Sequence, residues 1–361
     1  MNKTWTKKEV LAVYNRPLMQ LVYDAANQHR EYHNPLEVQV STLLSIKTGG
    51  CPEDCGYCPQ AARYHTDIEH NDLMSVSQVK AQALRAKSNG SSRLCMGAAW
   101  RNIQNNEEFD QVLEMVKTVN ELEMEVCCTL GMMSEDQARR LADAGLYAYN
   151  HNLDTSEEHY KEIISTREFD DRKKTIANAS KAGISVCSGG IIGMGESDED
   201  RCGMLVTLAN LNPQPKSVPI NALVPVEGTP LEDQQLVSIW DMVRMVATTR
   251  IVMPQAVVRL SAGRTQMSDE GQALCFMAGA SSIFAGDKLL TTPNPDINND
   301  MKLFDILGIN PKAPFVDGEQ PKTKESYKEC MSTKGNVKWD RPSHTIERNE
   351  KAKQKAKDLR A

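Results

Sequence analysis

The sequence of 361 residues lacks the features that define several protein classes. No apolar run approaches the roughly 18 to 20 residues that a membrane helix needs, and the first ten residues lack the apolar stretch of a secretory signal. Positive charge is not in excess, since Lys and Arg total 42 against 48 Asp and Glu. A protein that neutralises many phosphates usually shows the opposite balance. We therefore expect a cytoplasmic protein with no membrane and no nucleic-acid partner.

Ten cysteines are the unusual feature of the composition. A cytoplasmic protein keeps its thiols reduced, so cysteines there more often bind metal or take part in catalysis than form disulfides. The remaining composition, 40% apolar and 25% charged, is that of a folded protein.

A strand and helix alternation begins near residue 38 and continues to about residue 292. Each unit is a short apolar run that ends in small or polar residues and is followed by an amphipathic stretch. The predicted strands are residues 38–46, 92–96, 124–129, 148–153, 185–191, 217–223, 256–260 and 282–284. Among the predicted helices are residues 107–122, 134–144, 172–182, 198–209 and 236–251.

Eight such units in about 250 residues predict an α/β fold, specifically a (β/α)8 TIM-type barrel, rather than a doubly wound open sheet. No G-x-G-x-x-G follows the first strand, which also disfavours a dinucleotide-binding fold. We divide the chain into an N-terminal helical extension (1–37), a catalytic barrel (38–315) and a partly disordered, charged C-terminal tail (316–361). The tail is basic, with 12 Lys or Arg against 6 Asp or Glu in residues 321–361, and either is simply solvated or binds an anionic partner.

Three cysteines follow the first predicted strand at C-x3-C-x2-C spacing, namely Cys51, Cys55 and Cys58. Their thiolates can meet at one metal centre, and no fourth Cys or His follows at close spacing. Such a centre keeps an open position, which is typical of catalytic sites. The alternatives are a zinc site completed by His65 or His70, or unrelated core cysteines.

A second set lies on different strands and consists of Cys95, Cys127, Cys187 and Arg259. Residues on separate strands of a closed barrel can face the same lumen, where a buried guanidinium needs anionic partners. Each cysteine alone could equally be a small core residue. Cys128 points to the opposite face from Cys127 and is expected to pack in the core. We interpret Cys202, Cys275 and Cys330 as structural.

The cysteine triplet with an aromatic residue before its last member resembles the signature of radical S-adenosylmethionine enzymes. Among these enzymes, the chain most resembles the family of biotin synthases. The resemblance is carried by the local sequences STLLSIKTG, CPEDCGYCPQ, CMGAAW, YNHNLDT, VCSGGI and VRLSAGR. The resemblance covers roughly residues 5–315. It implies a [4Fe-4S] cluster on the triplet, whose open iron binds S-adenosylmethionine, and a [2Fe-2S] cluster on the second set.

The resemblance also implies roles for residues at the strand ends. It places Tyr57 beside the adenine of the cofactor, Gly97 and Ala98 at its methionyl amine, Ile191 and Gly193 at the adenine, and Asn152 and Asp154 at the ribose. It places Asn150, Asn152 and Asn221 around the cyclic urea of dethiobiotin and Thr291 and Thr292 at its carboxylate. An amide side chain offers both donors and acceptors, as a urea requires.

The implied activity is that of a sulfurtransferase which converts dethiobiotin to biotin, the last step of biotin biosynthesis. A 5′-deoxyadenosyl radical would abstract hydrogens and the [2Fe-2S] cluster would donate sulfur, with Cys51, Cys55, Cys58 and Arg259 as catalytic residues. The family also implies a homodimer, a flavodoxin-type electron donor and the iron–sulfur assembly machinery as partners. The alternatives are another radical barrel enzyme of the mutase or hydrogenase-maturation type, a zinc-binding or electron-transfer protein, and a barrel enzyme without metal.

Overall fold

The computed structural model describes residues 3–286 and 288–328. Two helices, α1 (Lys7–Tyr14) and α2 (Leu18–Tyr32), precede the first strand. Thr6 caps α1 through a capping box with Glu9, and Pro17 immediately precedes α2, at a helix start, where a proline is tolerated, rather than in a helix interior. These helices pack on α8 (Asp198–Ala209) and α9 (Ile239–Val252), on the outside of the barrel.

The main sheet is parallel and closed, which confirms the predicted (β/α)8 barrel. Closure is made by the first and last barrel strands, where Gln39 lies opposite Ser282 and Thr42 opposite Ala285. The barrel strands are β1 (Glu37–Lys47), β2 (Arg93–Ala98), β3 (Glu125–Thr129), β4 (Ala148–Asn150), β5 (Ser185–Cys187), β6 (Gly190–Ile192), β7 (Ser217–Ala222), β8 (Val257–Leu260) and β9 (Ser282–Ala285).

The fifth barrel position differs from the prediction of one strand over 185–191. The chain breaks after Cys187 and resumes at Gly190, so that β5 and β6 each pair with β7. A Cβ atom at Gly189 would overlap the carbonyl oxygen of Pro219, so the break needs a glycine where two backbones approach closely.

Helices surround the barrel and bury its outer face. Several begin with a serine whose hydroxyl accepts a backbone N–H, as at Ser75, Ser134 and Ser197. Besides α8 and α9 they are α3 (Val76–Ser88), α4 (Glu107–Asn120), α5 (Glu135–Asp143), α6 (Glu157–Ile163), α7 (Phe169–Lys181), α10 (Asp269–Met277) and α11 (Ile297–Leu307). None of the helices described is long and apolar enough to cross a membrane.

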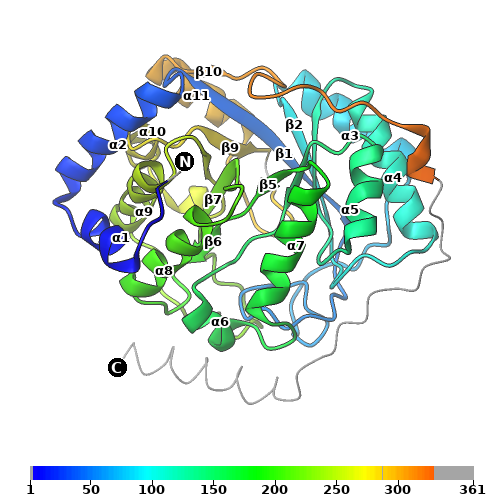
Figure 1. The fold of residues 1–361 in the computed structure, drawn as a ribbon, viewed down its shortest axis with the longest axis horizontal. Helices are drawn as coiled ribbons and strands as arrows, with labels where there is room; N and C mark the ends of the chain where they lie inside the picture. The colour runs from blue at the N-terminus through cyan, green and yellow to red at the C-terminus, as the bar shows by residue number, and fades with distance from the viewer. Residues whose placement is uncertain (1–2, 287, 329–361) are drawn as a thin grey trace.

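The chain after α11 returns to the amino-terminal ends of the strands, which we call the N-terminal mouth of the barrel. Strand β10 (Asn310–Pro311) pairs with the start of β1. The chain then runs past α4 and α5 to a short 3-10 helix, η2 (Glu325–Lys328), and is drawn in orange in Figure 1. Residues 316–328 of the predicted tail thus pack on the barrel, through bonds such as Tyr327 to Glu114 (2.6 Å). The rest of the tail, including Cys330, lies outside the described residues.

Candidate active site

One cavity of about 310 Å³ opens at the carboxyl ends of the barrel strands, the position of active sites on this fold. Most residues singled out from the sequence line it: Cys51, Cys55, Tyr57, Cys58, Cys95, Ala98, Asn150, Asn152, Asp154, Ile191, Asn221, Arg259, Thr291 and Thr292. Four others are not in the lining, namely Gly97, Cys127, Cys187 and Gly193.

The three thiols of the triplet are held by a turn after β1. Cys51 is tied to the end of its own loop, since its N–H donates to Gln60 and its carbonyl accepts from Ala62, while the Cys58 N–H closes a turn onto Cys55. Burial raises the pKa of all three thiols, that of Cys58 to about 12. The thiols are therefore protonated at neutral pH until a metal takes the place of the protons.

The triplet does not fit a single metal ion. Within residues 3–286 and 288–328, no group of three or more His, Cys, Asp or Glu side chains is arranged to hold one ion. The zinc alternative, completed by His65 or His70, therefore has no geometric support in this part of the chain. His70 instead packs its ring against Gly49, where an added Cβ would lie 2.7 Å from the ring.

The surroundings of the triplet fit a larger anionic group. The Arg167 guanidinium donates to the Cys55 sulfur (3.6 Å), and the Nε of Arg167 is buried without a hydrogen-bond partner among the described residues. His151 also lines the cavity, and its Nε2 is likewise buried without a hydrogen-bond partner among the described residues. Buried polar atoms with no partner are rare in a folded chain, so two beside one cavity point to a bound group that supplies partners.

The second set lies deeper, in the lumen. Cys95 and Cys127 are directly opposite on neighbouring strands, and they pack with Ala148, Phe284 and Leu289 in a cluster separate from the main core. Cys128 belongs to the main core on the other side of the sheet, as strand alternation predicts. Cys202 and Cys275 are likewise buried in helices.

Arg259 completes this set from β8. Its Nη1 donates to the Cys187 sulfur (3.8 Å), and its Nε donates to the Ser282 hydroxyl (3.0 Å). The Cys95 pKa falls to about 7, chiefly because the Cys127 thiol donates to its sulfur. Burial alone would raise this pKa, and the guanidinium groups of Arg259 and Arg93 offset part of that increase. The hydrogen bond to Cys95 and burial raise the pKa of Cys127 in turn, so this pair favours negative charge on the Cys95 sulfur only. Three thiols beside a guanidinium fit an iron–sulfur group with thiolate ligands.

An ion-pair network connects the triplet loop to the strand ends. The Tyr57 hydroxyl donates to the Asp154 carboxylate (2.7 Å), which also forms a buried ion pair with Arg172. Arg172 further donates to the Asn152 carbonyl (2.6 Å) and to the Tyr160 hydroxyl (3.0 Å). Asp154 holds a left-handed backbone with φ of 70°, and strain of this kind in non-glycine residues concentrates at functional sites.

Arg167 and Arg172 were missed by reasoning from the sequence. Both lie beyond the fourth strand in residues 167–172, and both side chains reach back into the cavity. No spacing rule identifies them, because their role depends on where α7 packs. The only available signal was the presence of two arginines near a site that was expected to bind anions.

The two glycines outside the lining act through the backbone. Gly193 has φ of 96° and donates its N–H to the Glu196 carboxylate (2.8 Å), which also accepts from Met194 and Arg201. The segment from Gly189 to Glu196, in which Ile191 and Gly193 lie, therefore ends in a turn held by a carboxylate. A Cβ at Gly97 would lie 2.7 Å from Leu290, so this glycine allows the loop after β9 to approach β2.

The three asparagines of the cavity already hold neighbouring groups. Asn150 donates to the Thr129 hydroxyl (3.2 Å), and the Asn152 side-chain oxygen accepts from the Gly189 N–H (3.2 Å). Asn221 binds the backbone on both sides, from its NH2 to Gly190 (2.9 Å) and from Ala262 to its oxygen (3.2 Å). Each amide keeps at least one further donor or acceptor site, so these bonds orient the side chains without using all their capacity.

Comparisons with known proteins agree with this geometry. The model of the radical SAM superfamily matches residues 45–208, and that of the biotin and thiamin synthesis associated domain matches residues 219–310. The chain is 71% identical to "Biotin synthase" of Flavobacterium psychrophilum, over 97% of each chain, and 69% identical to "Biotin synthase" of Christiangramia forsetii, over 98% of each.

A solved structure with the same fold is a maturase of the [FeFe]-hydrogenase, with a TM-score of 0.73. It is 18% identical and covers 86% of this chain and 72% of its own, so the likeness shows the fold alone. The barrel, the open cysteine triplet and the superfamily match define a radical S-adenosylmethionine enzyme. Because the relatives named biotin synthase match nearly the whole length at about 70% identity, the chain belongs to the biotin synthase family.

Proposed function

We propose that this enzyme inserts sulfur into dethiobiotin to form biotin. The observation that carries the proposal is that two separate thiol sets serve one cavity, with the triplet on its wall and Cys95 and Arg259 deeper in the lumen. S-adenosylmethionine on a [4Fe-4S] cluster would supply a 5′-deoxyadenosyl radical, and a [2Fe-2S] cluster would supply the sulfur. The protein's own contribution is to bind, orient and exclude water.

In this proposal Cys51, Cys55 and Cys58 hold the [4Fe-4S] cluster. Arg167 adds a charge-assisted hydrogen bond to the Cys55 sulfur, which stabilises the thiolate against the cost of burial. Cys95, Cys127, Cys187 and Arg259 hold the [2Fe-2S] cluster. The buried lumen supports this assignment, because a sulfide there is protected from water.

Contacts to the cofactor are assigned to the wall between the two sets. Asp154, held by Tyr57 and Arg172, would accept hydrogen bonds from ribose hydroxyls, while Asn152 lies beside it. Ala98 and Ile191 offer apolar surface and backbone groups, and Gly97 and Gly193 shape the turns that carry them.

In this proposal the asparagines contact the cyclic urea of dethiobiotin, and Thr291 and Thr292 contact the carboxylate at the other end of the substrate. The remaining amide donors and acceptors of Asn150, Asn152 and Asn221 match a cyclic urea, which has one carbonyl and two N–H groups. The threonine hydroxyls suit a carboxylate tail. Close fixation matters here, because productive geometry between a reactive group and its target carbon contributes several kcal/mol to catalysis.

The wider assignments form part of the same proposal. They are residues 38–315 as the catalytic barrel, a cytoplasmic location, a homodimer, a flavodoxin-type electron donor, and the iron–sulfur assembly machinery as the source of clusters. A reducing compartment is supported by the nine cysteines of the described residues, all of which are free thiols.

Anaerobic turnover with dethiobiotin, S-adenosylmethionine and a reductant tests the proposal. The enzyme should form both biotin and 5′-deoxyadenosine. Cys51→Ala should form neither, whereas Cys95→Ala should form 5′-deoxyadenosine without biotin, because only the sulfur source is removed. 5′-Deoxyadenosine without biotin from the unaltered chain would instead support a mutase or maturation activity, and absence of both products would contradict the proposal.

A further inference from the structure

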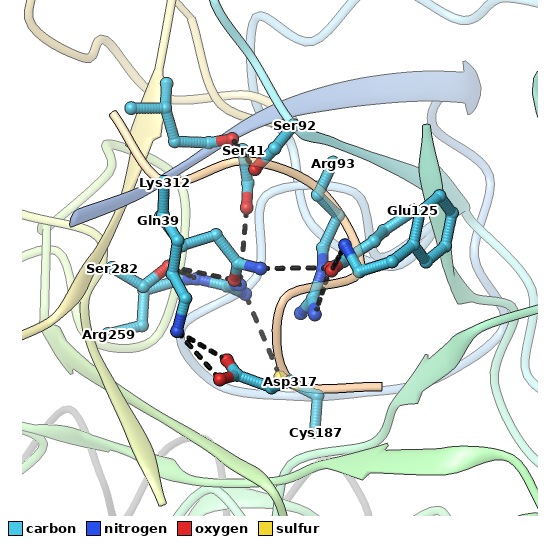
Figure 2. A network of polar contacts seen from close by, with 12 residues as sticks. Gln39, Ser41, Ser92, Arg93, Glu125, Cys187, Arg259, Ser282, Lys312 and Asp317 are labelled. Carbon is cyan, nitrogen blue, oxygen red and sulfur yellow. Dashed lines mark hydrogen bonds and ion pairs between the residues drawn. The ribbon is translucent and has the colours of Figure 1, made fainter. Parts of the chain in front are cut away.

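A layer of charged and polar side chains closes the lumen beneath the second thiol set. Its members are Gln39, Arg93, Glu125, Arg259 and Ser282, each at most 5% exposed. Figure 2 shows Glu125 beside Arg93, with Gln39 between Glu125 and Arg259. Charged groups at this depth are costly unless they are paired, so the pattern of pairing shows what the layer does.

Glu125 is the centre of the layer. One carboxylate oxygen accepts from the Gln39 amide (2.9 Å) and from two nitrogens of Arg93 (2.8 and 2.6 Å). The other oxygen accepts from the backbone N–H of Phe315 (2.8 Å), a residue 190 positions further along the chain. One carboxylate therefore links the lumen to the segment that follows β10.

Gln39 carries the effect of Glu125 to Arg259. Because its NH2 donates to the carboxylate, its oxygen must face the other way, where it accepts from Nη2 of Arg259 (3.3 Å) and from the Ser282 hydroxyl (3.4 Å). Ser282 in turn accepts from Nε of Arg259, whose Nη1 is then directed at the Cys187 sulfur. The orientation of the Arg259 guanidinium therefore depends on the orientation of the Gln39 amide.

The segment 312–317 closes the N-terminal mouth over this layer. Lys312 pairs with Asp317 across the segment (2.7 Å), and the Phe315 ring packs edge-on against Tyr147 (5.6 Å between ring centroids). Phe315 has a left-handed backbone with φ of 59°, a conformation that a non-glycine residue keeps only when its surroundings hold it. The bond to Glu125 is one of the contacts that hold it.

The charges of the layer are incomplete without a group in the lumen. Two guanidinium groups face one carboxylate, and Nη1 of Arg93 is buried without a hydrogen-bond partner among the described residues. An iron–sulfur group on three thiolates is anionic overall and would balance the surplus cation.

We propose that Glu125 is a positioning residue of the second thiol site and couples the loading of that site to the docking of residues 312–317. This inference rests on the proposed function, since it requires an iron–sulfur group at Cys95, Cys127 and Cys187. A loaded site fixes Arg259, Gln39 and Glu125, and Glu125 then holds the Phe315 N–H. Linkage makes the effect reciprocal, so a docked segment also favours the loaded site.

The test compares enzyme loaded at both sites with enzyme loaded at the first site only. Hydrogen exchange of a peptide that contains Phe315 measures docking, and the visible and Mössbauer spectra of the second cluster measure its environment. In the unaltered chain, loading the second site should slow exchange at the Phe315 amide by about 5- to 150-fold, the range of ordinary coupling free energies.

Two variants separate the links. Glu125→Gln keeps the shape but removes the charge, and it should abolish most of the slowing and alter the second-cluster spectrum. Gln39→Met keeps the bond between Glu125 and Phe315 but breaks the relay to Arg259, so it should alter the second-cluster spectrum and abolish most of the slowing that loading causes. In enzyme loaded at the first site only, exchange at Phe315 in this variant should stay close to that of the unaltered chain, whereas Glu125→Gln should speed it. The first-cluster spectrum should stay unchanged in both.

Asp143→Asn is the matched control. Asp143 holds the outer part of the same chain segment through Lys324 (2.9 Å) and Ser326 (3.2 Å), away from the lumen. Its substitution should speed exchange near residues 323–326 without changing the second-cluster spectrum. A change of that spectrum as large as in Glu125→Gln would show general loosening and overturn the proposal.

Equal exchange at Phe315 with and without the second cluster, or a Glu125→Gln variant with unaltered spectrum and exchange, would also overturn it. If the unaltered chain holds no second cluster, the proposed function itself fails. The two failures are therefore distinguishable.

Discussion

Replacing Asp154 by asparagine removes one charge from the buried network that connects the cysteine loop to the strand ends. Asp154 is 2% exposed, and Arg172 beside it is 3% exposed. Asparagine has nearly the same shape and tolerates the left-handed backbone that Asp154 adopts, so the substitution tests the charge and not the fold of the turn.

The expected cost follows from burial. Removing one partner of a buried ion pair leaves the other charge uncompensated and costs about 3–5 kcal/mol. The Tyr57 hydroxyl also loses a charged acceptor, but asparagine can still accept its hydrogen. Tyr57→Phe, which removes only that one bond to a charged group, should cost about 1.5–3 kcal/mol. We therefore expect Asp154→Asn to be the more destabilising of the two.

Denaturant unfolding of the metal-free chain measures both effects. The double variant Asp154→Asn/Arg172→Met removes both charges and should be more stable than Asp154→Asn alone. A loss below about 1 kcal/mol for Asp154→Asn, or a double variant less stable than the single one, would refute the view that this pair is a buried structural charge pair.

Three further predictions concern backbone space and pH. Gly131→Ala should lower the free energy of unfolding, measured in urea, more than Gly183→Ala does. Both glycines have positive φ, but only at Gly131 would a Cβ lie 2.6 Å from the Arg101 carbonyl carbon. Burial, with Arg250 nearby, lowers the pKa of His29 from 6.5 to about 3. The stability that neutral His29 contributes is therefore present above pH 6.5 and is lost as the pH falls towards 3. Unfolding curves at pH 7 and pH 4.5 should show a smaller loss of stability for His29→Gln than for the unaltered chain. Burial raises the Cys58 pKa from 9.0 to about 12, so its contribution in the metal-free chain is complete below pH 9 and is lost towards pH 12, and Cys58→Ala should weaken that alkaline loss.

Much of the fold follows from local patterns. The order of strands and helices is readable because each apolar run is short and is followed by a capped amphipathic stretch, as at Ser134 and Ser197. The assignment of Cys127 to the lumen and Cys128 to the outer core is readable from strand alternation alone. These features depend on residues that are close together in the sequence, so they can be predicted from the sequence alone.

The features that sequence reasoning missed depend on contacts between distant residues. The break at Gly189 reflects a close approach of the Pro219 backbone, and the Gly189–Gly190 pair permits a break in the fifth strand without showing which backbone approaches it. Arg172 enters the site only because α7 packs where it does. The link from Phe315 to Glu125 joins residues 190 positions apart in the sequence, and no local pattern around either residue indicates it.

Isotope labelling of the second site tests the central claim most directly. The site is loaded with isotopically labelled sulfide, the first site is left unlabelled, and one turnover is allowed with dethiobiotin and S-adenosylmethionine under anaerobic conditions. The account predicts that the biotin formed carries the label, and that Cys95→Ala forms no biotin under the same conditions. Unlabelled biotin, or labelled biotin from Cys95→Ala, would contradict the assignment of Cys95, Cys127, Cys187 and Arg259 as the sulfur-donating site.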